Sequence, residues 1–437
     1  MNKNSCIIYA PVSTFSGYGA NARDKVKALI NLKKEEWDIK IISCPWGDTP
    51  KNFIEENQER WGFLEEYILK EPLNYQPDYM FWITIPPEAQ KVGKWNCLIT
   101  AGIETDICSP TWLEGCNRMD LVLVSSEHSK KVFQDTKYNV NNPQTNQPQT
   151  LELRTQVEVL FEGVDPSIYT PTNKEITNEN LKSTLDKIPE KFAYLFAGMW
   201  MRGEFGEDRK NVSLLVKAFY ETFKTHKNPP ALILKTHSVK GSYIDRNQIM
   251  KRIHLLRKSL KVKNPPKIYL LHGEFTDQEM FELYNHPKIK AMISLTKGEG
   301  FGRPLLEFSF TGKPIITTGY SGHLDFLKPE FTALCGGTLT NLHQSVVVKD
   351  MLLPEAKWFT VDHGHVGHFL TDVHKNYKDW ELKGKKQGRY SRDRFTFDKM
   401  ETKFNKLLKQ YTPEIAKPVT LKLPKLNKIQ LPKLTKV

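Results

Sequence analysis

The stretch around residue 300 constrains the fold most, because an apolar strand there leads through glycines into a short helix. Ile289 to Leu295 is a mostly apolar run of strand length, and glycine occupies every second position from 298 to 302. Pro304 suits the first position of a helix, where its missing N–H costs nothing, and Gly312 suits the helix end. With the apolar run at 314–318, the pattern predicts strand, glycine loop, short helix and second strand.

Two glutamates bracket this loop. Glycine lets the main chain come close to a ligand at Gly300 and Gly302, and the free N–H groups of a helix start favour an anion such as a pyrophosphate. Glu299 lies in the loop, and Glu307 is expected in the first helical turn. Because a carboxylate repels phosphate, these acids are better suited to accept hydrogen bonds from sugar hydroxyls. The implied ligand carries both sugar and phosphate. The alternative is that the glycines form an ordinary connection between a strand and a helix, without a ligand.

The same residues resemble a known family. Glu299-Gly-Phe-Gly-Arg-Pro-Leu-Leu-Glu307, followed by Gly312-Lys-Pro-Ile-Ile and Gly319-Tyr-Ser-Gly-His, is similar to the nucleotide-sugar site of glycosyltransferase family four. The resemblance implies an α/β protein with two Rossmann-like domains facing each other across a cleft (the GT-B fold). It also implies sugar transfer with retention of anomeric configuration, from a nucleotide sugar such as a UDP-sugar.

The resemblance also implies roles for individual residues. Glu307 would bind the donor ribose, and Glu299 would face the transferred sugar and take part in catalysis. The amides of Phe301 and Gly302 would support sugar and phosphate. Arg303 departs from the family, which more often carries an aliphatic residue there; it either adds a phosphate contact or is a surface arginine.

The positive charge expected next to the diphosphate has several candidate sources. Family members usually place an arginine directly after the glycine that follows the first strand of this half, but Met199 stands there. Arg202, Arg209 or Lys210 therefore supplies the charge, or Lys235 does so from the end of the next predicted strand. Since these cations can neutralise the diphosphate and no aspartate-x-aspartate motif lies beside the loop, we expect no metal and no other cofactor.

The N-terminal half alternates strands and helices, which predicts a parallel sheet. It resembles the acceptor half of family members in its first loop, Gly17, Tyr18 and Gly19, and in the acids Glu104 and Asp106 after a predicted strand. Many members have a histidine near the acceptor where this chain has Glu104. Glu104 and Asp106 are thus candidate catalytic groups, with turn or helix capping as the alternative.

We predict four parts along the chain. Residues 1–165 form the acceptor-side domain, residues 166–395 the nucleotide-sugar domain, residues 396–412 a helix that crosses back to the first domain, and residues 413–437 a basic extended tail rich in proline and lysine. Within the first domain the polar run 139–150 is expected to be a loop.

Two motifs in the second half point to local structure. Thr276 and Glu279 have the spacing of a capping box that opens a helix. The segment from Asp362 to His368 contains closely spaced histidines that could share a metal ion, but obvious carboxylate or cysteine partners are lacking, and the segment resembles an ordinary loop and helix of the family.

Composition limits the class of protein and its partners. The 437 residues are 39% hydrophobic and 26% charged, as in globular proteins, and no apolar run approaches the roughly 20 residues that span a bilayer. With too short an apolar stretch for a secretory signal at the N-terminus, a cytoplasmic location is expected. The six cysteines lack the spacing of a zinc site. The net charge of +13 favours a polyanionic partner, or serves solubility alone.

The acceptor stays open between two classes. One is a glycan or small polyol, and the other is a hydroxymethylated pyrimidine in phage-type DNA, for which the net charge and the basic tail argue. A protein that binds a sugar nucleotide or nucleic acid without catalysis is an alternative from another class. Phosphorolysis is a third, but it would normally need a lysine-bound pyridoxal cofactor, for which no motif is evident.

Overall fold

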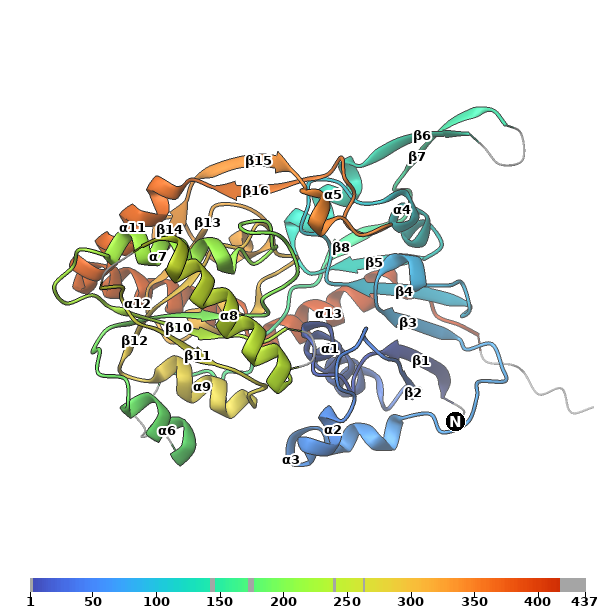
Figure 1. The fold of residues 1–437 in the computed structure, drawn as a ribbon. Coiled ribbons are helices and arrows are strands. Elements are labelled where there is room, and N and C mark those ends of the chain that lie inside the picture. The colour runs from blue at the N-terminus through green and yellow to red at the C-terminus, as the bar shows by residue number, and fades with distance from the viewer. Residues whose placement is uncertain (1–2, 142–145, 172–176, 239–240, 262–263, 417–437) are drawn as a thin grey trace, which may run out of the picture.

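The computed structural model describes residues 3–141, 146–171, 177–238, 241–261 and 264–416. They form two parallel six-stranded sheets with flanking helices, here called the first and second units, which lie side by side (Figure 1). The predicted α/β class with two Rossmann-like units is therefore confirmed. Within the described part of the chain, no helix has the length and apolar character needed to cross a membrane.

The first sheet is parallel throughout, and its central strands are buried along their whole length because helices cover the sheet. Across the sheet the strands are β2 (Trp37–Ser43), β1 (Asn4–Ala10), β3 (Tyr79–Ile83), β4 (Trp95–Thr100), β5 (Leu121–Val124) and β8 (Val157–Val159). The helices of this unit are α1 (Gly17–Lys33), α2 (Phe53–Glu56), α3 (Gln58–Trp61), η1 (Gly62–Tyr67), η2 (Pro86–Glu88), α4 (Pro110–Asn117) and α5 (Glu127–Asp135).

The second sheet has the strand order of dinucleotide-binding folds, with its first strand in the chain beside its fourth. Across the sheet the strands are β11 (Ile268–Leu271), β10 (Ala231–Lys235), β9 (Ala193–Ala197), β12 (Ile289–Ser294), β13 (Ile315–Thr318) and β14 (Ala333–Cys335). The order reverses between β9 and β12, and ligands of such sheets bind at the carboxyl ends of the strands at this point. The glycine loop after β12 and the loop after β9 therefore lie where a ligand is expected.

Helices connect and cover the strands of the second unit. They are α6 (Glu179–Asp186), α7 (Val212–Phe223), α8 (Tyr243–Ser259), α9 (Asp277–Asn285), α10 (Arg303–Ser309), η3 (Gly322–Asp325), η4 (Gln344–Val346), α11 (His363–Lys375) and α12 (Tyr377–Arg394). The predicted capping box is present at the start of α9, where the Thr276 side chain accepts from the Glu279 amide and the Glu279 side chain accepts from the Thr276 amide.

Three local predictions are wrong. Residues 17–19 are not a turn before a helix but the first turn of α1, which Ser16 caps. Residues 139–141 and 148–150 are not loop: they belong to β6 (Lys137–Asn141) and β7 (Pro148–Glu152), an antiparallel hairpin. Its strands are mostly exposed, so no buried face marked them in the sequence. Glu307 is the fifth residue of α10 and lies beyond its first turn.

The last described helix, α13 (Phe397–Tyr411), packs on the first unit although it follows the second unit in the chain (Figure 1). Its buried residues join the core of the first sheet. This agrees with the predicted division at 165/166 and 395/396, which stays a prediction. Most of the predicted basic tail, residues 417–437, lies outside the described residues.

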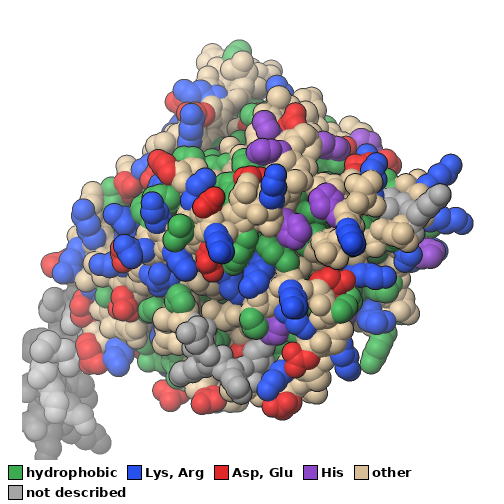
Figure 2. Space-filling view, turned by 90° about the vertical axis from the view of Figure 1, so that its left-hand side faces the viewer, with side chains coloured by type: hydrophobic (Ala, Val, Ile, Leu, Met, Phe, Trp, Pro, Cys, Tyr) green, Lys and Arg blue, Asp and Glu red, His purple; other side chains and the backbone are tan. Residues whose placement is uncertain are grey.

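The surface reflects the positive charge of the chain. Figure 2 shows many Lys and Arg side chains over the face of the second unit, with Asp and Glu side chains among them. Exposed basic residues of α12 belong to this unit: Lys378, Lys383, Lys385, Lys386, Arg389 and Arg394.

Candidate functional site

The glycine loop of the second unit packs directly against the first unit. A Cβ atom added at Gly298 would lie 2.1 Å from the carbonyl oxygen of Glu104, and one added at Gly300 would lie 2.1 Å from that of Ala101. Gly302, which precedes α10, has a φ of 96°, a conformation that favours glycine. In this closed arrangement, the bare backbone at Gly298 and Gly300 lets the loop reach the end of β4.

Glu299 is a buried carboxylate held by two cations. The Lys210 ammonium donates to Oε1, and Arg209 Nη1 lies 3.3 Å from Oε2. The amide of Glu299 donates to the Ser321 hydroxyl at 2.8 Å, which fixes the loop. Although burial opposes ionisation, Lys210 and Arg209 hold the pKa of Glu299 down at about 2. Glu299 is therefore ionised at neutral pH, in the loop that follows β12.

Arg209 also connects the two units. Its Nη1 lies 3.4 Å from Oε1 of Glu104 and donates to the carbonyl oxygen of Gly298 at 2.9 Å. The structure thus brings Glu104, Arg209, Lys210 and Glu299 together; their role as a site stays a prediction. Arg202 makes no ion pair in this cluster: it donates to the carbonyl oxygen of Val347 at 2.8 Å, although it lines the same pocket as Arg209.

Glu307 is enclosed by Arg303 and Tyr284. Arg303 Nε donates to Oε1 at 2.9 Å, and the Tyr284 hydroxyl lies 3.4 Å from Oε2. Burial raises the pKa of Glu307 to about 7, with Arg303 acting against the rise. Arg303 itself is neither a surface arginine nor a free cation at the loop, because it also pairs with Asp24 of α1.

Lys235 ends β10, a strand of the same sheet as β12, and its side chain is buried. Its ammonium lies 5.1 Å from the centre of the Phe275 ring. Burial lowers the pKa of Lys235, while Glu274, Glu279 and Glu307 favour the charged form. Lys235 therefore lies close enough to Glu307 to interact with it electrostatically.

The remaining residues predicted on the first unit have structural partners. Asp106 makes two hydrogen bonds to the backbone of Lys357, in β16 (Lys357–Val361). The Asp106 amide donates to the Lys357 carbonyl oxygen at 2.9 Å, and Asp106 Oδ1 accepts from the Lys357 amide at 2.6 Å. The hydroxyl of Tyr18, between Gly17 and Gly19, accepts from the Ala101 amide at 3.0 Å. Tyr18 thus ties α1 to the end of β4.

Asp24 is a site residue that sequence reasoning missed. It lies in α1, its side chain is 8% exposed, and it forms an ion pair with Arg303. A signal was present: Arg23, Asp24 and Lys25 are three successive charges that directly follow Ala22 and precede Val26 on the apolar helical pattern, and all three are buried. Charged residues are rarely buried without partners, so such a run indicates a polar contact.

The histidine-rich segment forms part of a helix. Asp362 caps α11 by accepting from the His365 amide at 3.1 Å. Among the residues that the structure describes, no group of three or more His, Cys, Asp and Glu side chains could hold a metal ion. The six cysteines are free and buried.

Comparison with solved structures identifies the fold. A glycosyltransferase from Rickettsia africae ESF-5 is 14% identical with a TM-score of 0.61, and the match covers 94% of this chain and 99% of that one. HepE of Anabaena, solved with UDP and glucose, is 12% identical with a TM-score of 0.55, covering 93% and 100%. Sucrose-phosphate synthase from Thermosynechococcus elongatus is 10% identical with a TM-score of 0.58, covering 93% and 99%.

These similarities extend over nearly the whole chain, so the two-unit arrangement is the fold shared with those proteins, as predicted. No protein-family model matches the sequence, and the comparison with curated proteins finds no match.

Proposed function

We propose that the chain is a glycosyltransferase that moves a sugar from a nucleotide sugar, a UDP-sugar, to a hydroxyl acceptor with retention of configuration. One observation carries the proposal: two buried glutamates, Glu299 within the glycine loop and Glu307 in the helix that follows it, lie at the reversal point of the second sheet. Arg209, Lys210 and Lys235 add three cations around them. Solved neighbours of the same fold include complexes with UDP and glucose, which supports the donor class.

In this proposal the acidic residues bind the sugar hydroxyls and the basic residues bind the diphosphate. Glu307 would accept hydrogen bonds from the ribose hydroxyls, and Glu299 would do so from the transferred sugar. Lys210, Arg209 and Lys235 would neutralise the diphosphate as it gains charge on leaving. The bond between the anomeric carbon and the diphosphate oxygen breaks, the acceptor oxygen bonds to that carbon, and the acceptor proton passes to the leaving diphosphate.

For the acceptor we propose a hydroxymethylated pyrimidine in DNA, on the strength of the net charge of +13. A base in duplex DNA must leave the stack to reach an enclosed site. A glycan or small polyol is the competing acceptor, and the dependence of transfer on salt separates the two.

The donor site is tested with Glu307→Ala and Lys235→Ala. A thermal-shift screen with nucleotide sugars first identifies the donor, and mass analysis of candidate acceptors then measures transfer. We expect each variant to lose roughly a hundredfold or more in turnover, since each removes a group that stabilises the bound donor or the leaving diphosphate.

Exposed residues of the same unit provide the controls for this test: Glu330→Ala and Lys191→Ala should keep wild-type turnover. Near-normal transfer by folded Glu307→Ala and Lys235→Ala proteins would contradict the assignment.

A further inference from the structure

A pocket of about 390 Å³ lies beside Arg209, among the loops that follow β9 and β10. This volume is within the range of small-molecule sites in proteins. Its walls come from the loop after β9, from α8 and from the segment between η4 and β16. Half-buried apolar side chains supply wall that a ligand could touch: Met199, Met201, Val348 and Leu352. The proposed function so far uses only Arg209 of this wall.

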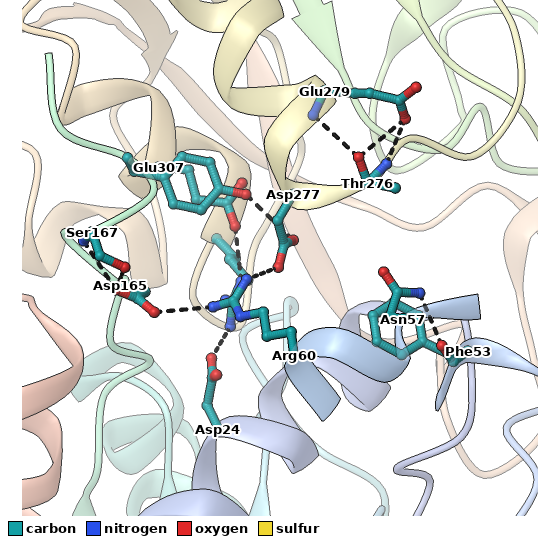
Figure 3. Close-up of polar contacts among 12 residues, drawn as sticks. Asp24, Phe53, Asn57, Arg60, Asp165, Ser167, Thr276, Asp277, Glu279 and Glu307 are labelled. Atoms are coloured by element: carbon teal, nitrogen blue, oxygen red, sulfur yellow. Dashed lines mark hydrogen bonds and ion pairs between the residues drawn. The ribbon is translucent and has the colours of Figure 1, made fainter. Parts of the chain in front are cut away.

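The pocket lies on the other face of the second sheet from Glu307. Trp200, in the pocket wall, belongs to the core cluster that α7 and α11 form with this sheet. Leu306 of α10, the helix of Glu307, belongs to a second cluster, and the two clusters take alternate residues of β9. Figure 3 shows Glu307 with Asp24 and Asp277 nearby, and neither of these lines the pocket. The pocket is therefore separate from the proposed ribose site.

The loop after β4, which the sequence predicts on the acceptor side, borders this pocket. The Glu104 carboxylate of that loop lies 3.4 Å from Nη1 of Arg209 in the pocket wall. Ile107, three residues later, packs against the apolar cluster that contains Trp358 of the wall. Because Arg209 also contacts Glu299, a ligand in the pocket would lie next to the place proposed for the transferred sugar.

Two polar groups of the pocket wall have no hydrogen-bond or ion-pair partner. The Trp358 side chain is fully buried, and its indole N–H meets no acceptor in the described part of the chain. A buried N–H without an acceptor is costly, so a ligand that brings an acceptor is favoured here. Arg252 of α8 pairs with no acid among the described residues, and its guanidinium lies 5.7 Å from the centre of the Trp200 ring. The wall thus offers a ligand one donor and one cation.

These features favour a planar ring that carries an anionic group. Methionine packs well against flat rings, and arginine pairs with phosphate. The one acid among the described lining residues, Asp245, already accepts from a backbone amide at 2.8 Å, whereas Arg202 and Arg252 pair with no described acid. A neutral sugar would leave both arginines without an anion. A pyrimidine nucleotide supplies the ring, the phosphate and a carbonyl oxygen for the Trp358 N–H.

We propose that this pocket is the acceptor site and binds a 5-hydroxymethylpyrimidine nucleotide. The base packs on the methionines, its phosphate lies at Arg252 and Arg202, and its hydroxymethyl group extends past Arg209 towards Glu299. A base held in such a pocket has left the duplex stack, as enzymes that modify bases require. The inference rests on the proposed function and deepens it, because it names the residues that hold the acceptor.

The test measures binding of 5-hydroxymethyl-2′-deoxycytidine monophosphate by calorimetry, without a sugar donor. The wild type should bind this nucleotide, and Arg252→Ala should weaken the binding by about tenfold, because it removes a charged hydrogen bond to the phosphate. Arg257→Ala, an exposed arginine of the same helix outside the pocket wall, is the matched control and should keep wild-type affinity. Equal affinities of the two variants would overturn the proposal.

A second variant and two further ligands separate this pocket from the donor site. Val348→Trp, which fills the pocket, should abolish binding of the hydroxymethylated nucleotide and leave UDP affinity unchanged. Loss of UDP binding in Arg252→Ala, or competition between UDP and the hydroxymethylated nucleotide, would show that the pocket belongs to the donor site and would overturn the proposal. Glucose that binds the wild type in place of the nucleotide would do the same.

Kinetics distinguish failure of this inference from failure of the proposed function. Where sugar transfer is measured, Arg252→Ala should raise the KM for the hydroxymethylated acceptor by about tenfold and leave kcat close to the wild-type value, since it acts on acceptor binding. An unchanged acceptor KM would overturn the assignment of the pocket. A wild type that binds the hydroxymethylated nucleotide in this pocket but transfers no sugar from any nucleotide sugar would contradict the proposed function alone.

Discussion

At the scale of single residues, Glu299 and Glu307 show how partners decide the state of a buried acid. Burial favours the neutral form of both. At Glu299 the charges of Lys210 and Arg209 outweigh the effect of burial, and the pKa falls to about 2. At Glu307 burial outweighs the charge of Arg303, and the pKa rises to about 7. Two chemically identical side chains on one loop and helix therefore respond to pH in opposite directions.

This difference predicts opposite effects on stability. Because the pKa of Glu299 is about 2 in the folded chain and 4.5 in the reference state, its ionisation stabilises the fold above pH 4.5, and this contribution is lost as pH falls towards 2. Glu299→Gln should lose roughly 3 kcal/mol of unfolding free energy at neutral pH, with the loss shrinking in acid. Denaturant unfolding across pH measures it.

Glu307→Gln is the internal comparison for that experiment. Since the pKa of Glu307 is raised from 4.5 to about 7, its ionised form destabilises the fold above pH 7, and the penalty vanishes below pH 4.5. The Gln variant should therefore gain stability relative to the wild type as pH rises through this window. If the unfolding free energies of both variants differed from the wild type with the same sign and the same dependence on pH, the conclusion that Glu299 and Glu307 lie in different environments would be contradicted.

At the scale of elements, α13 shows that sequence order and packing partner can differ. The helix follows the second unit in the chain, but Met400, Phe404 and Leu408 lie in the core of the first sheet. Phe404 is fully buried, and its ring makes an edge contact with Phe81 of β3, with ring centres 6.5 Å apart. The hydrophobic core of the first unit is therefore complete only when α13 packs on it.

Phe404→Ala should destabilise the first unit. Removing a buried phenylalanine costs about 3–5 kcal/mol, through lost burial and the cavity that remains. Lys406→Ala, an exposed position of the same helix, is the control and should change stability by less than about 0.5 kcal/mol. Denaturant unfolding followed by tryptophan fluorescence measures both, and an equally small change for the two variants would show that α13 does not complete this core.

At the scale of the whole molecule, the positive charge bears on the acceptor. The net charge is +13, and many Lys and Arg side chains are distributed over the face of the second unit, interspersed with acids (Figure 2). Charge of this kind attracts polyanions through release of their counterions, a term that weakens as salt rises. A neutral sugar acceptor gains nothing from it.

Transfer to DNA should therefore fall by roughly tenfold or more between about 50 and 200 mM salt, measured as initial rate at low acceptor concentration. Transfer to a neutral glycan or polyol should hardly respond over the same range. Donor binding in the absence of acceptor is measured in parallel, so that a salt effect on the charged nucleotide can be subtracted. A salt-independent rate on hydroxymethylated DNA would contradict the electrostatic account.

The sequence by itself determined features that depend on neighbours a few positions away. The strand, glycine loop and short helix at 289–309 follow from apolar periodicity and from Pro304. The capping box at Thr276 and the helix expected at 396–412, which the structure has at 397–411, were predicted for the same reason. Even the candidate site could be predicted in part, because Glu299, Arg209 and Lys210 lie in the loops that follow two strands of one parallel sheet, β12 and β9.

Only the tertiary structure decided which distant charges meet. Asp24 and Arg303 are 279 residues apart, and Asp106 and Lys357 are 251 apart. No local pattern encodes such pairs, because they arise when two separately formed sheets close on each other. Local propensity acts through the backbone of adjacent residues, whereas the partners of Glu307 and the burial that raises its pKa exist only once the helices of both units are packed together.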